Sequence, residues 1–209
     1  MEQFLVPAGE GASEYMEKKS RFLGLIVPVT TEAEARARLE AVKKQEYDAR
    51  HNCWCYIIKD GAERYSDDGE PQGTAGQPIL NVLEREGVQD VLCVVTRYFG
   101  GILLGAGGLL RAYTKSAKDA LDAAGISVVR RWVETALDCS YAAAEKLKQE
   151  ITAFGGIVAG LDYGAAVTIH AYVPEESAED FKARIFDVSA GGVTVCVTGE
   201  DFRAVPRVK

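Results

Sequence analysis

The pattern of apolar and polar residues over the first 126 positions switches between the period of strands and the period of helices. The segment SRFLGLIVPV at 20–29 has strand character, and Thr31-Glu32-Ala33-Glu34 is a capping box that opens a helix. The run VLCVVT at 91–96 is apolar throughout, which is typical of a strand buried on both faces. The elements predicted here are strands at 20–29, 51–58, 62–66 and 91–96, with a hairpin turn at Asp60-Gly61, and helices at 31–45, 78–86 and 105–124.

The remaining residues repeat a simpler order. After Ser127 the pattern is strand, helix, strand, strand, helix, strand, with apolar helical stripes at 144–154 and 178–188. This order is the split βαβ, or ferredoxin-like, arrangement. The sequence therefore predicts an α+β protein of two domains: a two-layer α/β domain at 1–126 and a ferredoxin-like domain at 127–209.

Composition and charge narrow the class of protein. With 47% hydrophobic and 26% charged residues, the chain of 209 residues is of ordinary globular type, and no apolar run approaches the roughly 20 residues of a membrane span. Its five cysteines are an odd number and lie mostly inside apolar runs, so we expect buried thiols in a cytoplasmic protein without disulfides. The net charge of -7 argues against indiscriminate nucleic-acid binding, and any such contact must be a local patch.

The segment RYFGGILLGAGGLLRAY at 97–113 carries five glycines where an apolar run enters a helix. Each glycine inside a helix costs about 1 kcal/mol relative to alanine, so bare backbone must serve a purpose here. A glycine-rich turn at a helix N-terminus offers backbone N–H groups to an anion or a ribose phosphate, and arginines add charge-assisted hydrogen bonds. The alternative is that the glycines only allow close helix packing. The candidate binding residues are Arg97, Tyr98, Phe99, Gly100, Gly101, Gly105, Gly107, Gly108 and Arg111.

The segment SDDGEPQGTAG at 66–76 is the second unusual stretch. Its three carboxylates could hold a hard cation such as magnesium or act as general acid and base, although a solvated acidic turn has the same composition. His51, Cys53 and Cys55 alternate on one strand face, but no fourth ligand has zinc-site spacing, so we expect a buried face there. We expect no catalytic residue, metal ion or cofactor. The candidate binding residues here are His51, Asp67, Asp68, Glu70, Gly73 and Thr74.

Three motifs together resemble the IMPACT family in its bacterial two-domain branch: HNC at 51–53, DDGEPQGTAGQPIL at 67–80, and the glycine-rich segment at 97–113. The resemblance implies an N-terminal domain similar to the second domain of a small-subunit ribosomal protein and to domain IV of elongation factor G. It implies a ferredoxin-like C-terminal domain similar to domain V of that factor. Eukaryotic members regulate translation through a protein partner and carry an additional N-terminal domain, which we do not expect in this chain.

The resemblance leads us to expect a non-enzymatic, translation-associated regulator that binds the ribosome, RNA or a translation-related protein, and no membrane. The contact surface would be the acidic loop at 67–76 together with the glycine-rich loop at 97–111. The alternative is an enzyme that binds a small molecule or nucleotide by its phosphate, with Asp67, Asp68 and Thr74 positioning substrate and magnesium. A peptidase activity has no motif beyond His51 and the carboxylates. The first two interpretations require the two loops to be neighbours in space.

Overall fold

The computed structural model describes residues 3–207. They form two compact units, one at Phe4–Val129 together with residues 204–207 and the other at Arg130–Arg203 together with Gln3. The predicted domain boundaries, 1–126 and 127–209, stay a prediction, because compactness alone does not show that either unit folds by itself. No helix in this part of the chain combines the length and the apolarity that crossing a membrane demands.

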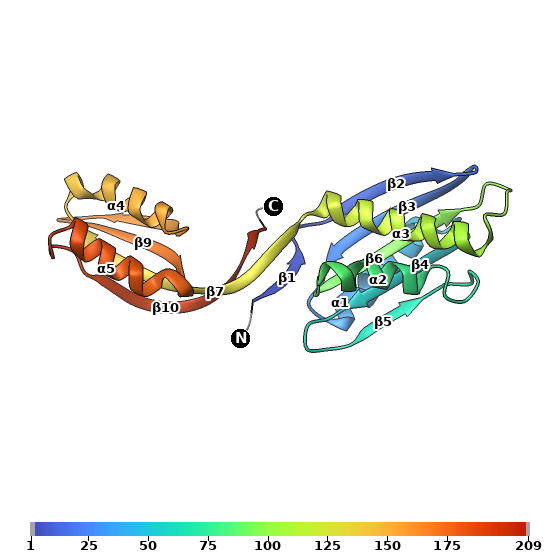
Figure 1. The fold of residues 1–209 in the computed structure, drawn as a ribbon, viewed down its shortest axis with the longest axis horizontal. Coiled ribbons are helices and arrows are strands. Elements are labelled where there is room, and N and C mark those ends of the chain that lie inside the picture. The colour runs from blue at the N-terminus through green and yellow to red at the C-terminus, as the bar shows by residue number, and fades with distance from the viewer. Residues whose placement is uncertain (1–2, 208–209) are drawn as a thin grey trace. The chain divides into compact units, whose positions relative to one another are not determined.

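The first unit is built on a five-stranded antiparallel sheet (Figure 1). Its central strand β6, Val91–Tyr98, is buried from Val91 to Arg97, which confirms the prediction from the continuous apolar run. Such burial requires cover on both faces of the sheet. In sheet order the strands are β2 (Gly11–Glu17), β3 (Ser20–Pro28), β6, β4 (His51–Ile57) and β5 (Glu63–Ser66).

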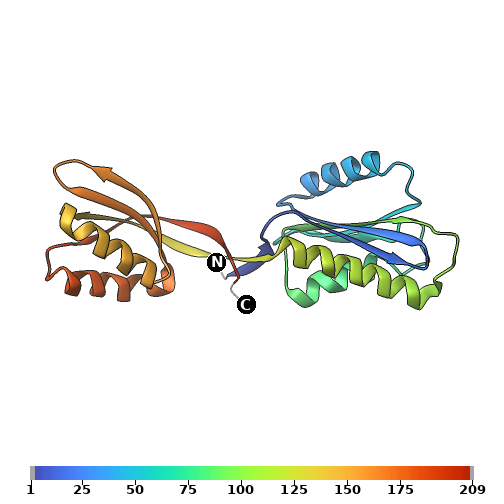
Figure 2. The same ribbon diagram turned by 90° about the horizontal axis from the view of Figure 1, so that it is seen from above.

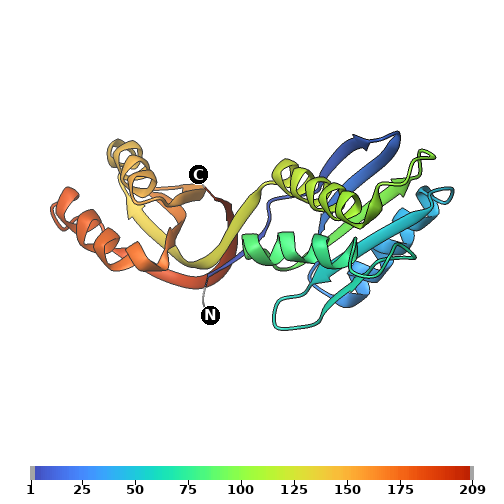
Figure 3. The same ribbon diagram turned by 45° about the vertical axis from the view of Figure 1, so that its right-hand side comes forward.

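Three helices provide this cover (Figure 2, Figure 3). α1, Glu32–Gln45, lies on one face, and α2, Gly76–Glu86, and α3, Gly105–Ala124, lie side by side on the other. The Thr31 side chain accepts a hydrogen bond from the Glu34 amide, as the capping-box prediction requires. α2 and α3 begin where the two unusual loops end, so the sheet brings both helix N-termini to one end of the unit (Figure 1).

The second unit has the predicted βαββαβ order. Strand β7, Ile126–Cys139, lies beside β10 and β9 in the order β10-β7-β9-β8. α4 and α5 cover the same face of this sheet (Figure 2), where Leu147, Ile151 and Phe181 enter the core. The ferredoxin-like arrangement is therefore confirmed. The other elements are α4 (Tyr141–Ala153), β8 (Ile157–Tyr163), β9 (Val167–Pro174), a 3₁₀ turn (Glu175–Ser177), α5 (Ala178–Val188) and β10 (Val195–Pro206).

The sequence pattern does not reveal two of the strands. β1, Phe4–Pro7, pairs with the first residues of β7, at Ile126–Val129. The sequence of β2 lacks a clear apolar alternation, because its inward positions include Gly11 and Tyr15 where a typical strand has aliphatic residues. A Cβ added at Gly11 would lie 2.3 Å from the backbone nitrogen of Ala124, so only glycine permits α3 to pack this closely on the strand.

Candidate functional site

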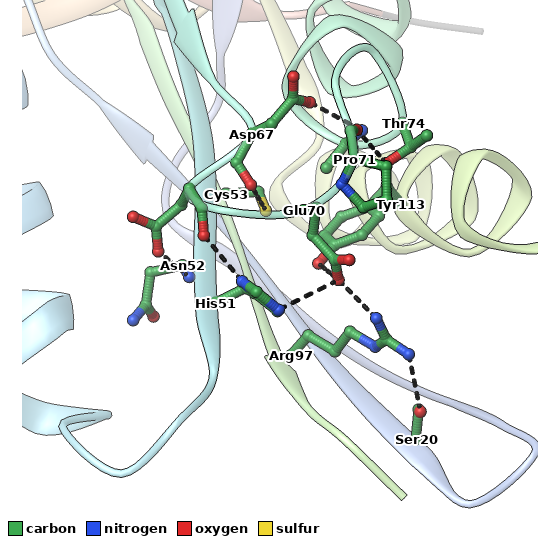
Figure 4. A network of polar contacts seen from close by, with 12 residues as sticks. Ser20, His51, Asn52, Cys53, Asp67, Glu70, Pro71, Thr74, Arg97 and Tyr113 are labelled. Carbon is green, nitrogen blue, oxygen red and sulfur yellow. Dashed lines mark hydrogen bonds and ion pairs between the residues drawn. The ribbon is translucent and has the colours of Figure 1, made fainter. Parts of the chain in front are cut away.

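A buried ion pair joins the two unusual loops (Figure 4). Nη1 of Arg97, near the end of β6, lies 2.6 Å from Oε1 of Glu70, and the two side chains are 6% and 4% exposed. The hydroxyl of Tyr113, on α3, donates to the same carboxylate oxygen at 2.9 Å. Burial, with Cys53 and Glu70 nearby, raises the pKa of Tyr113, so this hydroxyl keeps its proton. The Glu70 carboxylate thus has the partners that a buried charge requires.

The same arginine connects the β2–β3 hairpin to the ion pair. Nη2 of Arg97 donates to the Ser20 hydroxyl at 3.3 Å, and the Gly100 amide donates to that hydroxyl at 3.3 Å. A Cβ added at Gly100 would lie 2.0 Å from the carbonyl carbon of Lys19, so the glycine-rich loop lies directly against the hairpin backbone. Nε of Arg97 is buried and has no hydrogen-bond partner among residues 3–207. One donor of the guanidinium is therefore unused.

His51, the first residue of β4, lies between the loops in a defined tautomer. Its Nδ1 is 2.7 Å from the carbonyl oxygen of Asp68, and because a carbonyl oxygen only accepts, Nδ1 carries the proton. Its Nε2 is 3.9 Å from Oε1 of Glu70, which is too far for a hydrogen bond. In the neutral imidazole, Nε2 is therefore an acceptor that the described part of the chain leaves without a donor.

The acidic loop is folded around its first carboxylate. Asp67 accepts hydrogen bonds from the amides of Gly73, Ala75 and Gly76 at 2.8, 3.0 and 2.8 Å. It thereby caps the N-terminus of α2, whose own cap residue, Ala75, has no side chain for this purpose. The Thr74 hydroxyl is turned inward as well, and it donates to a carbonyl oxygen of the loop at 2.6 Å.

Asp68 also binds the backbone, because its carboxylate accepts a hydrogen bond from the backbone amide of Asn52 at 2.6 Å. Within residues 3–207, no three histidine, cysteine, aspartate or glutamate side chains gather as a metal ion would require. The structure thus shows Asp67 and Asp68 as organisers of the loop backbone. It gives no support to the magnesium-binding role that the enzyme interpretation assigns to them.

The two loops border a single cavity of about 540 Å³. This volume is in the range of pockets that bind small ligands. The spatial convergence that both functional interpretations require is therefore present. The predicted residues His51, Glu70, Arg97, Phe99 and Gly105 reach the cavity wall, together with Arg50, Gly69, Pro71, Leu103, Leu104, Ala106 and Leu109.

The other candidates from the glycine-rich segment lie outside this wall. Tyr98 points to the opposite face of the sheet, where its hydroxyl donates to Glu46 and Asp48. Arg111 is exposed on α3. Gly101 has a φ of +82°, a conformation that favours glycine. The loop and the first turn of the helix also contain Gly100, Gly107 and Gly108.

Three cations at this end of the unit were not among the predicted residues. Lys18 and Lys19 form the two-residue turn of the β2–β3 hairpin. Arg50 precedes β4, and its guanidinium carbon lies 5.4 Å from the ring centre of Phe99. None of the three belongs to an ion pair within residues 3–207. They are distant from Arg97 in sequence, so no linear motif indicates this group.

The core cysteines make a pH-dependent contribution to stability. Burial raises the pKa of Cys53, Cys55 and Cys93 well above the usual thiol value. Because the folded-state pKa is the higher one, this stabilisation is complete below the unfolded-state pKa of about 8.5 and is lost as the pH rises above it. We expect the free energy of unfolding to fall by on the order of 1 kcal/mol per thiol for each pH unit above about 9.

Urea titrations at several alkaline pH values under reducing conditions measure this slope. Cys55→Ala removes one buried thiol, so the free energy of unfolding is expected to fall less steeply with pH, by the contribution of that one thiol. Cys196→Ala is the matched control, because Cys196 is exposed and free. An equal slope in the wild type and in Cys55→Ala would contradict the prediction.

Comparison with known proteins identifies relatives over up to 96% of the chain. Residues 18–121 match the model of the Impact N-terminal domain, and residues 137–191 match a domain of unknown function (DUF1949). The chain is 38% identical to "IMPACT family member YvyE" of Bacillus subtilis, over 87% of this chain and 84% of that protein. It is 34% identical to "IMPACT family member YigZ" of Escherichia coli, over 96% of this chain and 100% of that protein.

A solved structure has the same fold. It is titled "Crystal structure of an hypothetical protein" and superposes with a TM-score of 0.60 at 33% sequence identity. The match covers 95% of this chain and 98% of that one. The likeness therefore extends over both compact units.

Proposed function

Since the chain belongs to the IMPACT family, we propose that it is a non-enzymatic, translation-associated protein that binds ribosomal RNA with one end of its Phe4–Val129 unit. The turn–pocket surface, as we name this end, consists of Lys18, Lys19, Arg50 and the wall of the 540 Å³ cavity. The expected likeness of the N-terminal domain to a translation-factor domain leads us to propose the ribosome as the partner.

The observation that carries the proposal is the pair of residues in the hairpin turn. Lys18 and Lys19 have φ values of 44° and 68°, which is the pattern of a type I′ turn, for which Asn-Gly is the favoured sequence. Each lysine in the left-handed region costs on the order of 1 kcal/mol. Strain of this kind in a folded protein motivates the hypothesis of a functional role, and two lysines on a turn suit contact with phosphates.

The arrangement of the carboxylates supports a local contact in a protein of net charge -7. Glu70 is paired with Arg97, and Asp67 and Asp68 face backbone amides of the protein itself. The cations of the turn–pocket surface therefore remain available to a polyanion, although the chain as a whole is acidic.

A variant that removes both charges and also relieves the strain tests the proposal. Lys18→Asn with Lys19→Gly creates the favoured turn sequence, so the free energy of unfolding is expected to rise by up to about 1–2 kcal/mol. Co-sedimentation with ribosomes is expected to weaken, and the slope of log affinity against log salt to fall by about 1.5, because two phosphate contacts are lost.

Lys146→Gln with Lys148→Gln is the matched control, since it removes two lysines, one exposed and one half-buried, from α4 in the other unit. It is expected to leave co-sedimentation unchanged. Equal sedimentation of the wild type and the turn variant at low and at moderate salt would overturn the RNA contact. Binding that is insensitive to salt would point to a protein partner instead.

A further inference from the structure

We propose that the cavity of the turn–pocket surface binds a ribonucleotide unit, with its phosphate at the N-terminus of α3 and its 2′-hydroxyl donating to Nε2 of His51. This inference rests on the proposed function and adds to it the ligand class and the residues that recognise it. Three features of the cavity wall support it: an uncapped helix, a buried cation with an unused donor, and an acceptor without a partner.

The first feature is a contrast between the two neighbouring helices. The amides that begin α2 are satisfied by the Asp67 carboxylate. α3 has Leu104 as its N-cap residue, which makes no side-chain hydrogen bond to the helix. The first residues of α3, Gly105 and Ala106, lie on the cavity wall, so the positive end of a 20-residue helix opens into the cavity. Such an end binds phosphate.

The second feature is independent of the helix. Arg97 lies on the wall and is 5% exposed, yet its Nε is buried without a partner in the described chain. A native structure rarely leaves a buried donor unused, and such a group indicates a missing partner. The guanidinium is already paired with Glu70 and Nε itself has almost no accessible surface, so a ligand or its bound water reaches this donor only when the side chains of the wall shift slightly.

The third feature distinguishes between anions. Nδ1 of His51 donates to the carbonyl oxygen of Asp68, which leaves Nε2 of the neutral imidazole as an acceptor. A phosphate dianion has no proton to donate to Nε2, whereas a ribose hydroxyl has one. A ligand that combines an anion with a hydroxyl donor satisfies both the helix N-terminus and Nε2, and RNA has such a hydroxyl at the 2′ position whereas DNA does not. Phe99, Leu103 and Leu104 give the cavity an apolar wall for the sugar or the base.

Binding of fluorescently labelled single-stranded RNA, compared with DNA of the same sequence, measures this recognition. The wild type is expected to prefer RNA by about fivefold, the worth of one neutral hydrogen bond. His51→Asn retains a donor for the Asp68 carbonyl but lacks the Nε2 acceptor. We expect the affinity of this variant for RNA to fall to the level of its affinity for DNA. Its affinity for DNA is expected to equal that of the wild type.

His170→Asn is the matched control, because His170 is the other of the two histidines and lies in the other unit. It is expected to retain the preference for RNA. Ala106→Glu tests the phosphate site: a carboxylate at the start of α3 stabilises the helix but repels phosphate. Both RNA and DNA affinities are expected to fall by about tenfold or more while the thermal midpoint does not decrease.

The outcomes separate this inference from the proposed function. Equal affinity for RNA and DNA in the wild type, or an unchanged preference in His51→Asn, overturns the ribonucleotide pocket. If ribosome binding still depends on the Lys18-Lys19 turn, the proposed function remains. Unlabelled AMP distinguishes two sources of the ligand: effective competition assigns the cavity to a free nucleotide, and competition by longer RNA alone assigns it to a strand.

Discussion

Replacing Arg97 by alanine is expected to lower the free energy of unfolding by about 3–5 kcal/mol. The substitution leaves Glu70 as a buried carboxylate with the Tyr113 hydroxyl as its remaining close donor. It also removes the link from the guanidinium to Ser20 in the hairpin. The cost of an unpaired buried charge exceeds what the ion pair itself contributes, because that charge was desolvated when the protein folded. Urea denaturation of both proteins at neutral pH measures the difference.

Arg111→Ala provides the matched control, because it removes an exposed arginine from the same segment. We expect a change within about 0.5 kcal/mol. A second variant, Arg97→Met with Glu70→Leu, removes both charges and is expected to recover part of the loss, although the Tyr113 hydroxyl then lacks its acceptor. A loss below 1 kcal/mol in Arg97→Ala, relative to wild type, would show that water reaches Glu70 and that the pair is not effectively buried.

Regular elements with strong periodicity are predictable from this sequence. The helix at Gly105–Ala124 and the strand that begins at Val91 follow directly from apolar spacing, since both bury a continuous face. β2 does not follow, because its packing on α3 depends on the absence of a side chain at Gly11. A glycine that permits contact looks the same in sequence as a glycine in a flexible loop.

In the candidate site, the part that depends on strand pairing was predictable from the sequence. His51 and Arg97 are directly opposite each other in the β4–β6 pairing, so two strands predicted from pattern bring both loops together. Which carboxylate faces which partner is not encoded in spacing. Positive φ values at Asp68 and Gly69 turn Glu70 inward toward Arg97. That turn depends on contacts with strands distant in sequence. The sequence pattern therefore does not distinguish the carboxylates of Asp67, Asp68 and Glu70, whereas in the structure each has different partners.

Two glycines of the same segment are expected to respond to alanine with opposite signs. In Gly100→Ala the new Cβ would lie 2.0 Å from the carbonyl carbon and oxygen of Lys19. Neither atom can move without displacing the β2–β3 hairpin, so we expect a loss of about 3 kcal/mol in the free energy of unfolding. In Gly107→Ala the nearest atom is Nη1 of Arg111 at 3.5 Å, the end of a flexible side chain, and the backbone is helical. Here we expect a gain of about 0.5–1 kcal/mol.

The pair of variants separates the two reasons for glycine in this segment. A loss in Gly100→Ala with a gain in Gly107→Ala means that Gly100 serves close packing, whereas Gly107 is kept at a cost in stability. Gly107 lies on the exposed first turn of α3. A glycine that is retained there at a cost in stability is consistent with a site that uses uncovered backbone amides. Destabilisation of both variants, measured by urea denaturation, would contradict this distinction and assign the whole segment to internal packing.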